Sequence, residues 1–563
     1  MKRPDGKTKF LMVQGTGSHV GKSLLVAALC RIFSNRGFGV APFKAQNMAL
    51  NSAVTAAGEE VGRSIAVQAR AARAALQVEM NPVLLKPKSD TMAQMILLGK
   101  PYADLSAMAQ FRIGPQAKDY DLAGVVEISP GAQDHGAPLG DRNGNHGVPF
   151  KIGPQAKDYG VPFGEASSLK EVKLGAIRRS LATLSRSFER VVIEGAGSPA
   201  EVNLREWDVV NMAVAEMVDA PVLLVADIDR GGAIAALIGT WTLLTDGERR
   251  RIKGFIINKF RGDPRLLAPA LTFLQEKTGI PTVGVIPYDS GLSLMEEDTL
   301  ASRSIGCGEP EIEIAVVEHR HLSNFTDLDP LAVEPGVTIR YIRTPAQMGS
   351  PDAVILPGTK NTVGDLRHHA ESGLAGRIQK LAGEGVPVVG LCGGYQMMGK
   401  VLLDPDHLES DHGDIEGLNL LEVSTQFRPG KIVKQAGVRP SGQGPFLQES
   451  DLAIQGYEIH SGETAPLHEK VFPAFYRLAQ GNVLEGEGAT TRSGLIFGTS
   501  VHGIFEEDRF RRQFVNVLRA RKGLPLLTGP IVNYAQIQDA EIGRWARHVE
   551  DHLDWPVLEK LFI

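Results

Sequence analysis

Short runs of apolar residues alternate with helix-like stretches along most of the chain. Eight of these runs are Phe10–Gln14, Val191–Glu194, Pro221–Asp227, Gly254–Asn258, Glu313–Val317, Val337–Ile342, Ala353–Pro357 and Pro387–Leu391. None shows the strict apolar–polar alternation of a half-exposed strand, so the runs are typical of buried parallel strands with crossover helices. The pattern predicts an α/β fold with two parallel-sheet domains, residues 1–305 and 312–563. We expect the join in Ala301–Glu311, which has turn residues but no periodicity.

One segment of the first domain interrupts this pattern. Residues 112–168 are rich in Gly, Pro, Asp and Asn, and the octapeptide IGPQAKDY at Ile113–Tyr120 recurs at Ile152–Tyr159. Two copies are too few for a solenoid, and this density of Pro and Gly favours loop structure. We therefore predict a flexible insertion, with a lid or an interaction arm as the functional alternative.

Composition narrows the class of protein. The 563 residues exceed what one hydrophobic core organises, and 43% apolar and 22% charged residues are ordinary for a globular protein. The net charge of −5 gives no electrostatic reason to expect nucleic acid as a partner. No apolar run is long enough for a membrane span, and the first run is too short for a signal-peptide core. Three cysteines, Cys30, Cys307 and Cys392, form no C-x-x-C pair, which favours a cytoplasmic location. Assembly of the chain into a homo-oligomer is compatible with the sequence.

The segment Gly15–Ser23, GTGSHVGKS, lies between the first apolar run and an amphipathic stretch, LLVAALCRIF. This strand–loop–helix context is the one that a phosphate-binding loop requires, because glycine N–H groups and a helix N-terminus converge on an anion. Lys22 would reach the β- and γ-phosphates of ATP, and Ser23 would bind Mg²⁺. The predicted ATP-binding residues of the loop are Thr16, Gly17, Gly21, Lys22 and Ser23. Thr16 stands where G-x-x-x-x-G-K-[ST] has its first glycine, so a chance glycine-rich turn is the alternative.

The second domain contains VVGLCGGYQ, in which a buried strand leads into G-x-C-x-G around Cys392. This is the cysteine version of a nucleophile elbow, where a sharp turn needs small neighbours. A following helix start lowers the thiol pKa and favours the thiolate. The N–H of Gly393 would stabilise an oxyanion, with a second donor at Gly358 in PGTKNT. The alternative is an inert core cysteine.

Several segments carry a resemblance to a known family. The loop G-T-x-S-x-x-G-K-S is similar to the variant loop of dethiobiotin synthetase and of the cobyrinate-type amide synthetases. Five further segments match in order: FKAQNMALNS (43–52), NPVLLKPKSDT (81–91), VVIEGAGSPAE (191–201), DIDRGG (227–232) and GFIINKFRGD (254–263). This ordered set resembles the cobyric acid synthase family over essentially the whole chain outside residues 112–168.

The resemblance implies roles for four residues. Glu194, at the end of a strand, would be a Mg²⁺ ligand, and Asn258 would recognise adenine by analogy with dethiobiotin synthetase. His502 in FGTSVHGIFE matches the family's catalytic histidine segment, whereas His460 in GYEIHSG is interpreted as structural or interface-forming. Ile504 stands where ordinary class I glutamine amidotransferases have the orienting glutamate of H-x-E. A Cys–His dyad is therefore expected, and Glu506 is not given the orienting role.

The resemblance also implies an activity. The enzyme would be a carbon–nitrogen ligase that uses ATP, Mg²⁺ and glutamine to amidate the b, d, e and g carboxylates of a corrinoid, adenosylcobyrinic acid a,c-diamide, in cobalamin biosynthesis. Cobyrinic acid a,c-diamide synthase is an alternative, although KAQN and EGAGSPAE favour the first assignment. The lipid II amidating synthetase has a cysteine-rich zinc element that is absent from this sequence. The alternative from another class is a P-loop regulatory protein with a degenerate amidotransferase module. The presence of both Cys392 and His502 makes a degenerate module the weaker interpretation.

Overall fold

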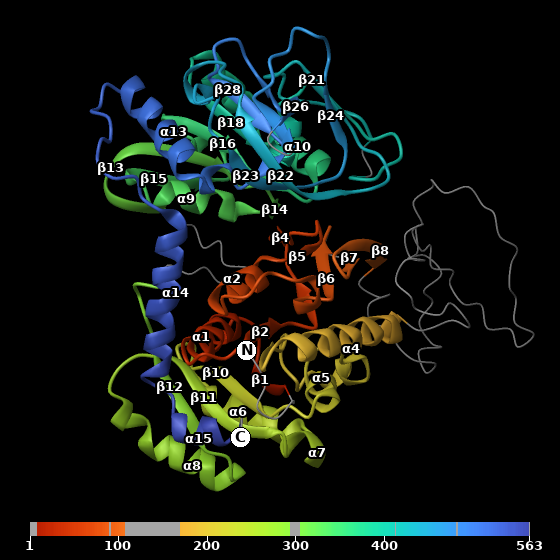
Figure 1. Cartoon of the computed structure of the whole chain (residues 1–563), viewed down its shortest axis with the longest axis vertical. Coiled ribbons are helices and arrows are strands. Elements are labelled where there is room, and N and C mark those ends of the chain that lie inside the picture. The colour runs from red at the N-terminus through yellow and green to blue at the C-terminus, as the bar shows by residue number, and fades with distance from the viewer. Residues whose placement is uncertain are drawn as a thin grey trace, which may run out of the picture.

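The computed structural model describes residues 8–88, 92–106, 169–292, 304–410, 413–479 and 482–561. Two α/β units lie one above the other along the long axis of the molecule, and the first and last described elements, β1 (Lys9–Gly15) and α15 (Trp555–Lys560), both lie in the lower unit (Figure 1). The predicted insertion at 112–168, with its repeated octapeptide, lies outside the described residues. Within the described residues, no helix combines the length and the apolar character needed to cross a membrane.

A parallel sheet forms the centre of the lower unit. In the described part of the chain it has the strand order β12-β11-β10-β1-β9-β2, and all neighbouring strands run parallel. The strands are β1 (Lys9–Gly15), β2 (Val40–Phe43), β9 (Arg190–Glu194), β10 (Val222–Asp227), β11 (Ile252–Phe260) and β12 (Thr282–Pro287). The first four predicted strands are thereby confirmed. Leu11, Met12 and Val13 on β1 are all fully buried, which explains the missing alternation.

Helices cover both faces of this sheet. Leu11 and Val13 face a core formed with α1 (Lys22–Asn35), α14 (Tyr534–Glu550) and α15 (Trp555–Lys560). Met12 faces the opposite core. The helices of that second core are α2 (Arg63–Ala71), α4 (Leu169–Ser187), α5 (Met212–Met217), α6 (Ala233–Leu243) and α8 (Ala268–Thr278).

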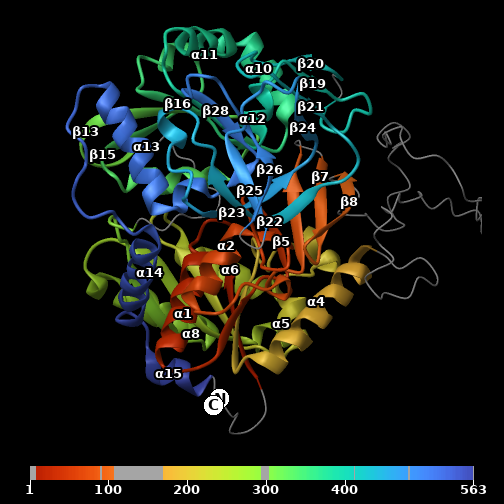
Figure 2. The same cartoon turned by 45° about the horizontal axis from the view of Figure 1, so that its top comes forward.

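Small β-elements of the lower unit lie between its main sheet and the upper unit, as both views show (Figures 1 and 2). One sheet has the order β3-β6-β7-β8, in which β3 and β6 run parallel and the other pairs antiparallel. A separate antiparallel pair is formed by β4 and β5. Their bounds are β3 (Gln46–Met48), β4 (Ser52–Val54), β5 (Glu60–Gly62), β6 (Val83–Pro87), β7 (Met92–Leu97) and β8 (Lys100–Ser106).

The upper unit is built on a second main sheet, ordered β15-β13-β16-β18-β28-β27 over the residues described. Its strands are β13 (Ser304–Val317), β15 (Pro335–Ile342), β16 (Ala353–Leu356), β18 (Val388–Leu391), β27 (Ala489–Thr490) and β28 (Ile496–Thr499). All pairs are parallel except β27 with β28. The last four predicted strands are confirmed. Helices α10 (Thr362–Glu371), α11 (Leu374–Gly383), α12 (Gly393–Met397) and α13 (Asp508–Arg521) belong to this unit.

An antiparallel sheet, which the sequence patterns did not predict, also belongs to the upper unit. Its order is β26-β25-β22-β23-β29. The strands are β22 (Ile432–Pro440), β23 (Ile454–His460), β25 (Phe475–Ala479), β26 (Asn482–Glu487) and β29 (Val501–His502). A further small sheet contains β19 (Val401–Leu403), β20 (Ile415–Glu416), β21 (Val423–Gln426) and β24 (Glu463–Pro466).

The segment expected to join the two domains differs from the prediction. A connector without regular structure was expected over Ala301–Glu311, and this is wrong from Ser304 onward, because β13 begins there. The register of β13 against β15 shifts repeatedly between Ser304 and Ile312. This irregular pairing coincides with the part of the sequence that shows no periodicity.

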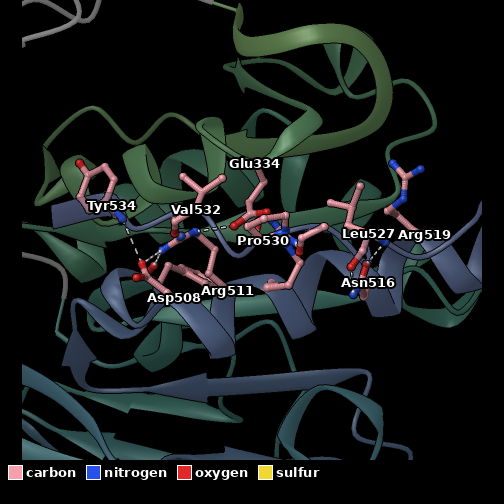
Figure 3. Close-up of polar contacts among 12 residues, drawn as sticks. Glu334, Asp508, Arg511, Asn516, Arg519, Leu527, Pro530, Val532 and Tyr534 are labelled. Carbon is pink, nitrogen blue, oxygen red and sulfur yellow. Dashed lines mark hydrogen bonds and ion pairs between the residues drawn. The ribbon is translucent and has the colours of Figure 1, made fainter. Parts of the chain in front are cut away.

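The chain leaves the upper unit after α13 and returns to the lower one. Buried Glu334 accepts hydrogen bonds from Nε of Arg511 (2.9 Å) and of Arg512 (2.7 Å), and Arg511 also donates to the carbonyl of Val532 (Figure 3). The backbone N–H of Tyr534 donates to Asp508 (3.1 Å), which fixes the start of α14. Residues 534–560 then pack on the first sheet, although they fall within the range predicted for the second domain, 312–563.

Trp545 on α14 is the basis of a stability prediction. It is 4% exposed, packs in the core around α1, and donates from Nε1 to the carbonyl of Leu24 (2.8 Å). Trp545→Ala should lower the free energy of unfolding of the lower unit by about 3–5 kcal/mol, because it leaves a large cavity. Ile537→Ala on the same helix, where the side chain is 38% exposed, should cost less than about 1 kcal/mol. Denaturant unfolding of both variants tests this, and equal losses would contradict the packing described.

Candidate active site

The loop between β1 and α1 has the backbone that its glycines predict. Gly21 has φ 92°, in the left-handed region that favours glycine. A Cβ at Gly15 would lie 2.6 Å from Val20 and 2.8 Å from Lys22 Nζ, so no side chain fits there. Lys22 Nζ donates to the carbonyls of Gly17 (2.7 Å) and Gly197 (3.2 Å). The amine thus lies across the loop, where a phosphate-binding lysine is needed.

Glu194 ends β9 beside this loop and is 2% exposed. It accepts hydrogen bonds from Ser23 Oγ (2.7 Å) and Gln68 Nε2 (2.6 Å), and Lys44 Nζ lies 2.9 Å away as an ion pair. Burial acts to raise the pKa of Glu194, but Lys44 and the hydrogen bonds outweigh it and lower that pKa. The carboxylate is therefore ionised at neutral pH. Glu194 and Ser23 were predicted from the sequence, whereas Lys44 and Gln68 were not; Lys44 lies in the matched segment FKAQNMALNS.

The donor set of Ser23 and Glu194 fits a magnesium ion. One hydroxyl and one ionised carboxylate lie 2.7 Å apart next to a phosphate loop. Mg²⁺ binds oxygen ligands and is usually held by one or two carboxylates together with substrate phosphates. The two residues predicted to bind the metal are thus brought together.

A cavity of about 620 Å³ opens beside the loop. Its walls include the loop, Glu194, and the strand Gln46–Met48. Asn258 on β11 is buried and donates from Nδ2 to the carbonyl of Val20 (2.8 Å), so it supports the loop from behind. The binding of adenine by Asn258 stays a prediction. Thr16 lies in the same loop, and its N–H donates to the carbonyl of Val225 (2.9 Å).

The turn after β18 holds Cys392 in a strained conformation. Cys392 has φ 50° and ψ −111°, which non-glycine residues rarely adopt. A Cβ at Gly394 would lie 1.9 Å from the carbonyl oxygen of Leu356, and one at Gly390 would lie 2.4 Å from Met398 Sδ. The predicted need for small neighbours is confirmed, and this close packing keeps the turn in place.

His502 lies beside Cys392 and is oriented by a carboxylate. Its Nδ1 is 2.6 Å from Asp327 Oδ2, and the N–H of Gly503 donates to the other oxygen of Asp327 (3.1 Å). His502 and Asp327 are both buried, and His502 also forms a hydrogen bond with Cys392. Tyr457 stacks on the imidazole, with ring centroids 5.2 Å apart. With Nδ1 bound to Asp327, Nε2 is the nitrogen available to the sulfur.

The expectation of a Cys–His dyad without an orienting carboxylate is therefore wrong. Asp327 lies 175 residues before His502, in SNFTDLDP, and no spacing rule connects the two segments. Glu506, which was not predicted to have this role, forms an ion pair with Arg63 (3.0 Å).

The electrostatics of this site favour a thiolate–imidazolium pair. Burial raises the pKa of the Cys392 thiol, but the charge and hydrogen bond of His502, the charge of His460 and the N–H of Gly393 outweigh it and lower that pKa. Burial lowers the pKa of His502, but Asp327 and Cys392 raise it to about 10. At neutral pH the sulfur is thus biased toward the nucleophilic form.

His460 lines the same small cavity but has other partners. Its Nδ1 lies 3.0 Å from the carbonyl oxygen of Gly462, and its Nε2 lies 3.3 Å from Glu458 Oε2. Glu458 is itself hydrogen-bonded to Arg477. Because both ring nitrogens are engaged elsewhere, the geometry favours His502 over His460 as the partner of Cys392.

The two glycines predicted to form an oxyanion hole both lie at the site. Gly358, on β17 (Gly358–Thr359), lies so close to His502 that a Cβ would be 3.3 Å from its Cε1. Gly393 follows Cys392, and a Cβ there would be 3.0 Å from the backbone nitrogen of Thr359. Their role as N–H donors stays a prediction.

Comparison with known proteins assigns each unit to a family. Residues 11–300 match the family model described as CobQ/CobB/MinD/ParA nucleotide binding domain. Residues 313–510 match the CobB/CobQ-like glutamine amidotransferase domain. A cobyric acid synthase of Pelotomaculum thermopropionicum is 46% identical over 92% of this chain and 88% of its own. The cobyric acid synthase of Moorella thermoacetica is 44% identical over 97% of this chain and 96% of its own. The cobyric acid synthase of Citrobacter koseri is 41% identical over 99% of this chain and 98% of its own.

Alkylation of Cys392 tests the ion pair directly. The pKa of Cys392 lies below its ordinary value of 9.0, so iodoacetamide should modify it at neutral pH, and the rate should fall as pH falls through that lowered pKa. Asp327→Asn removes the charge that stabilises the imidazolium, so the thiol pKa should rise. Alkylation at pH 7 should then slow on the order of tenfold. Peptide mass spectrometry follows the reaction, with buried Cys30 as internal reference; an unchanged pH profile in Asp327→Asn would refute the assigned role of Asp327.

Proposed function

The chain belongs to the cobyric acid synthase family, and on that premise we propose that it amidates the b, d, e and g carboxylates of adenosylcobyrinic acid a,c-diamide with ammonia from glutamine. It is a glutamine-hydrolysing ligase of cobalamin biosynthesis that consumes ATP. One observation carries this proposal above all: a single chain holds a phosphate loop with its carboxylate in one unit and the Cys392–His502–Asp327 arrangement in the other.

The lower unit would activate the carboxylate. A carboxylate is a poor acyl donor because oxide is a poor leaving group. Transfer of the γ-phosphoryl group of ATP to the carboxylate gives an acyl phosphate and ADP, and attack by ammonia then releases phosphate and leaves the amide. Lys22, which lies across the loop, would neutralise charge on the transferred group. Ser23 and Glu194 would hold Mg²⁺, which when bound supplies further charge neutralisation on the phosphates.

The upper unit would supply ammonia. The Cys392 thiolate attacks the side-chain amide carbon of glutamine, and the N–H groups of Gly358 and Gly393 would stabilise the oxyanion. His502 Nε2 donates a proton to the leaving ammonia, and a thioester remains. His502 then takes a proton from water, which attacks the thioester and releases glutamate. Asp327 fixes the imidazole with Nε2 toward the sulfur throughout.

The names of the relatives support the b, d, e and g carboxylates as the groups that are amidated. Cobyrinic acid a,c-diamide synthase would use the same chemistry on the a and c carboxylates, whereas the relatives named above are cobyric acid synthases at 41–46% identity. A regulatory P-loop protein with a degenerate amidotransferase module would have no need of an oriented His502. Asn258 as the adenine-binding residue and a cytoplasmic location belong to the same proposal.

Mass spectrometry of the corrinoid tests the activity. Adenosylcobyrinic acid a,c-diamide incubated with enzyme, ATP, Mg²⁺ and glutamine should gain four amides stepwise. Lys22→Ala should reduce synthesis on the order of a thousandfold with either glutamine or ammonium salt, because carboxylate activation is lost. Near-normal amidation by Lys22→Ala with ammonium salt would exclude the assigned phosphate loop. No reaction with the a,c-diamide, together with amidation of the a and c carboxylates when cobyrinic acid is supplied instead, would favour the alternative synthase.

A nitrogen-source switch tests the division of labour between the units. Cys392→Ser should abolish the use of glutamine, because a serine hydroxyl is a far weaker nucleophile than a thiolate. Amidation should persist with ammonium salt at high pH, where free ammonia is available. His502→Ala should behave in the same way, and His460→Ala, the matched control, should keep a substantial glutaminase rate. If folded Cys392→Ser loses amidation with both glutamine and ammonium salt, the assigned role of Cys392 is refuted. If His460→Ala loses only the use of glutamine while His502→Ala keeps it, the choice of His502 as the base is refuted.

A further inference from the structure

The cavity beside the phosphate loop has an apolar part, which we call the apolar rim. Besides the loop, the lining of this 620 Å³ cavity contains Met48 of β3, together with Leu204 and Trp207 of the 3₁₀ helix η3 (Val202–Trp207). These three residues define the apolar rim. Phosphate groups and Mg²⁺ bind to N–H groups, cations and oxygen ligands, none of which the three side chains offer to a phosphate. The apolar rim is therefore suited to another part of a bound ligand.

The order of strands separates the apolar rim from the proposed adenine side of the nucleotide site. Strand β1, which leads into the phosphate loop, has β10 and β11 on one side and β9 and β2 on the other. Asn258, the proposed adenine-binding residue, is on β11, whereas η3 follows β9 and β3 follows β2 along the chain. Glu194 also ends β9. The apolar rim thus comes from the side of the sheet that carries the proposed metal carboxylate, where the γ-phosphate of ATP would react.

The apolar side chains of η3 are not used for packing. Val202 is 61% exposed, and none of the residues of η3, all of which the structure describes, is buried. Polar contacts hold the helix instead: Arg205 forms an ion pair with Glu248, and Lys170 on α4 donates to the carbonyl of Glu206. An exposed group of large apolar side chains is a recognised sign of a binding surface. The helix is thus held in place while its apolar side chains stay accessible to a ligand.

Amidation of four carboxylates at one site limits the contacts that can bind the substrate. The b, d, e and g carboxylates are attached at different points around the corrin ring, so the ring must turn each time another of them reaches the γ-phosphate. Hydrogen bonds are directional, and a set that fits one orientation of the ring would be broken in the next. Apolar contact is non-directional and depends mainly on the area that is covered. A surface of apolar side chains therefore accepts all four orientations.

From this placement, and resting on the proposed function, we propose that the apolar rim binds the corrin ring of the substrate in every one of the four reactions. The carboxylate that is being amidated enters the polar part of the same cavity, where Lys22 and Lys44 supply positive charge. The apolar rim thus selects the macrocycle, whereas the polar part accepts whichever side-chain carboxylate the ring presents. Trp207, Leu204 and Met48 are specificity-determining residues in this arrangement.

Steady-state kinetics of the full-length enzyme test this role. Trp207→Ala should raise the KM for adenosylcobyrinic acid a,c-diamide about tenfold, because the ring loses a large apolar contact. The kcat at saturating corrinoid, the KM for ATP and the glutaminase rate should all stay within about twofold of the wild type, as expected when only substrate binding is weakened. Mass spectrometry of the partly amidated products should show that all four steps slow by similar factors at limiting corrinoid. Leu204→Ala should give the same pattern with a smaller rise in KM.

Leu266→Ala is the matched control and should keep the wild-type KM for the corrinoid. Leu266 is 79% exposed on another 3₁₀ helix of the lower unit, η4 (Pro264–Leu267), and is not among the described residues that line the cavity.

Three results would overturn the proposal: a wild-type KM for the corrinoid in folded Trp207→Ala, an equal rise in the KM for ATP, which would assign the rim to adenine, or a loss confined to one of the four steps. Circular dichroism verifies folding. If Trp207→Ala does not fold, Leu204→Ala and Met48→Ala must show the rise in KM, and wild-type values in both would overturn the proposal. Failure of the wild type to amidate the a,c-diamide would instead refute the proposed function.

Discussion

The position of His502 relative to the nucleotide site depends on a few hydrogen bonds between the units. Ser323 Oγ donates to the carbonyl of Leu50 (3.0 Å), and Asn324 Oδ1 accepts the N–H of Ser52 (3.2 Å). Asn324 also donates to the hydroxyl of Tyr457 (3.2 Å), whose ring stacks on His502. The orientation of the imidazole in one unit is therefore set in part by backbone of the other.

Features encoded in consecutive residues could be predicted from the sequence. A strand buried on both faces leaves one continuous apolar run, so all eight quoted runs correspond to strands. The phosphate loop and the turn at Cys392 are equally local. At Gly15, Gly21, Gly390 and Gly394, backbone angle or close packing excludes a side chain, and these glycines are visible in the sequence itself.

Features made by contacts between distant segments could not be predicted. Asp327 is one of 65 acidic residues, and nothing near it in the sequence points to His502. Gln68 lies 126 residues from Glu194, and Lys431 lies 371 residues from Glu60, with which it forms an ion pair. Only the folded chain brings these groups together. The beginning of β13 was not predicted either, because its sequence lacks the period of two by which a strand is recognised; its pairing with β15 is also irregular.

The return of α14 to the lower unit has a consequence for synthesis on the ribosome. Domains generally fold in the order in which they emerge, the N-terminal one first. Here the apolar side of α1 is covered by Ile542, Trp545 and Val549, which are translated after the amidotransferase unit. The nascent nucleotide-binding unit thus exposes that surface until the whole amidotransferase unit has been made. The nucleotide-binding unit is thus synthesised before the amidotransferase unit, but its core is completed after it.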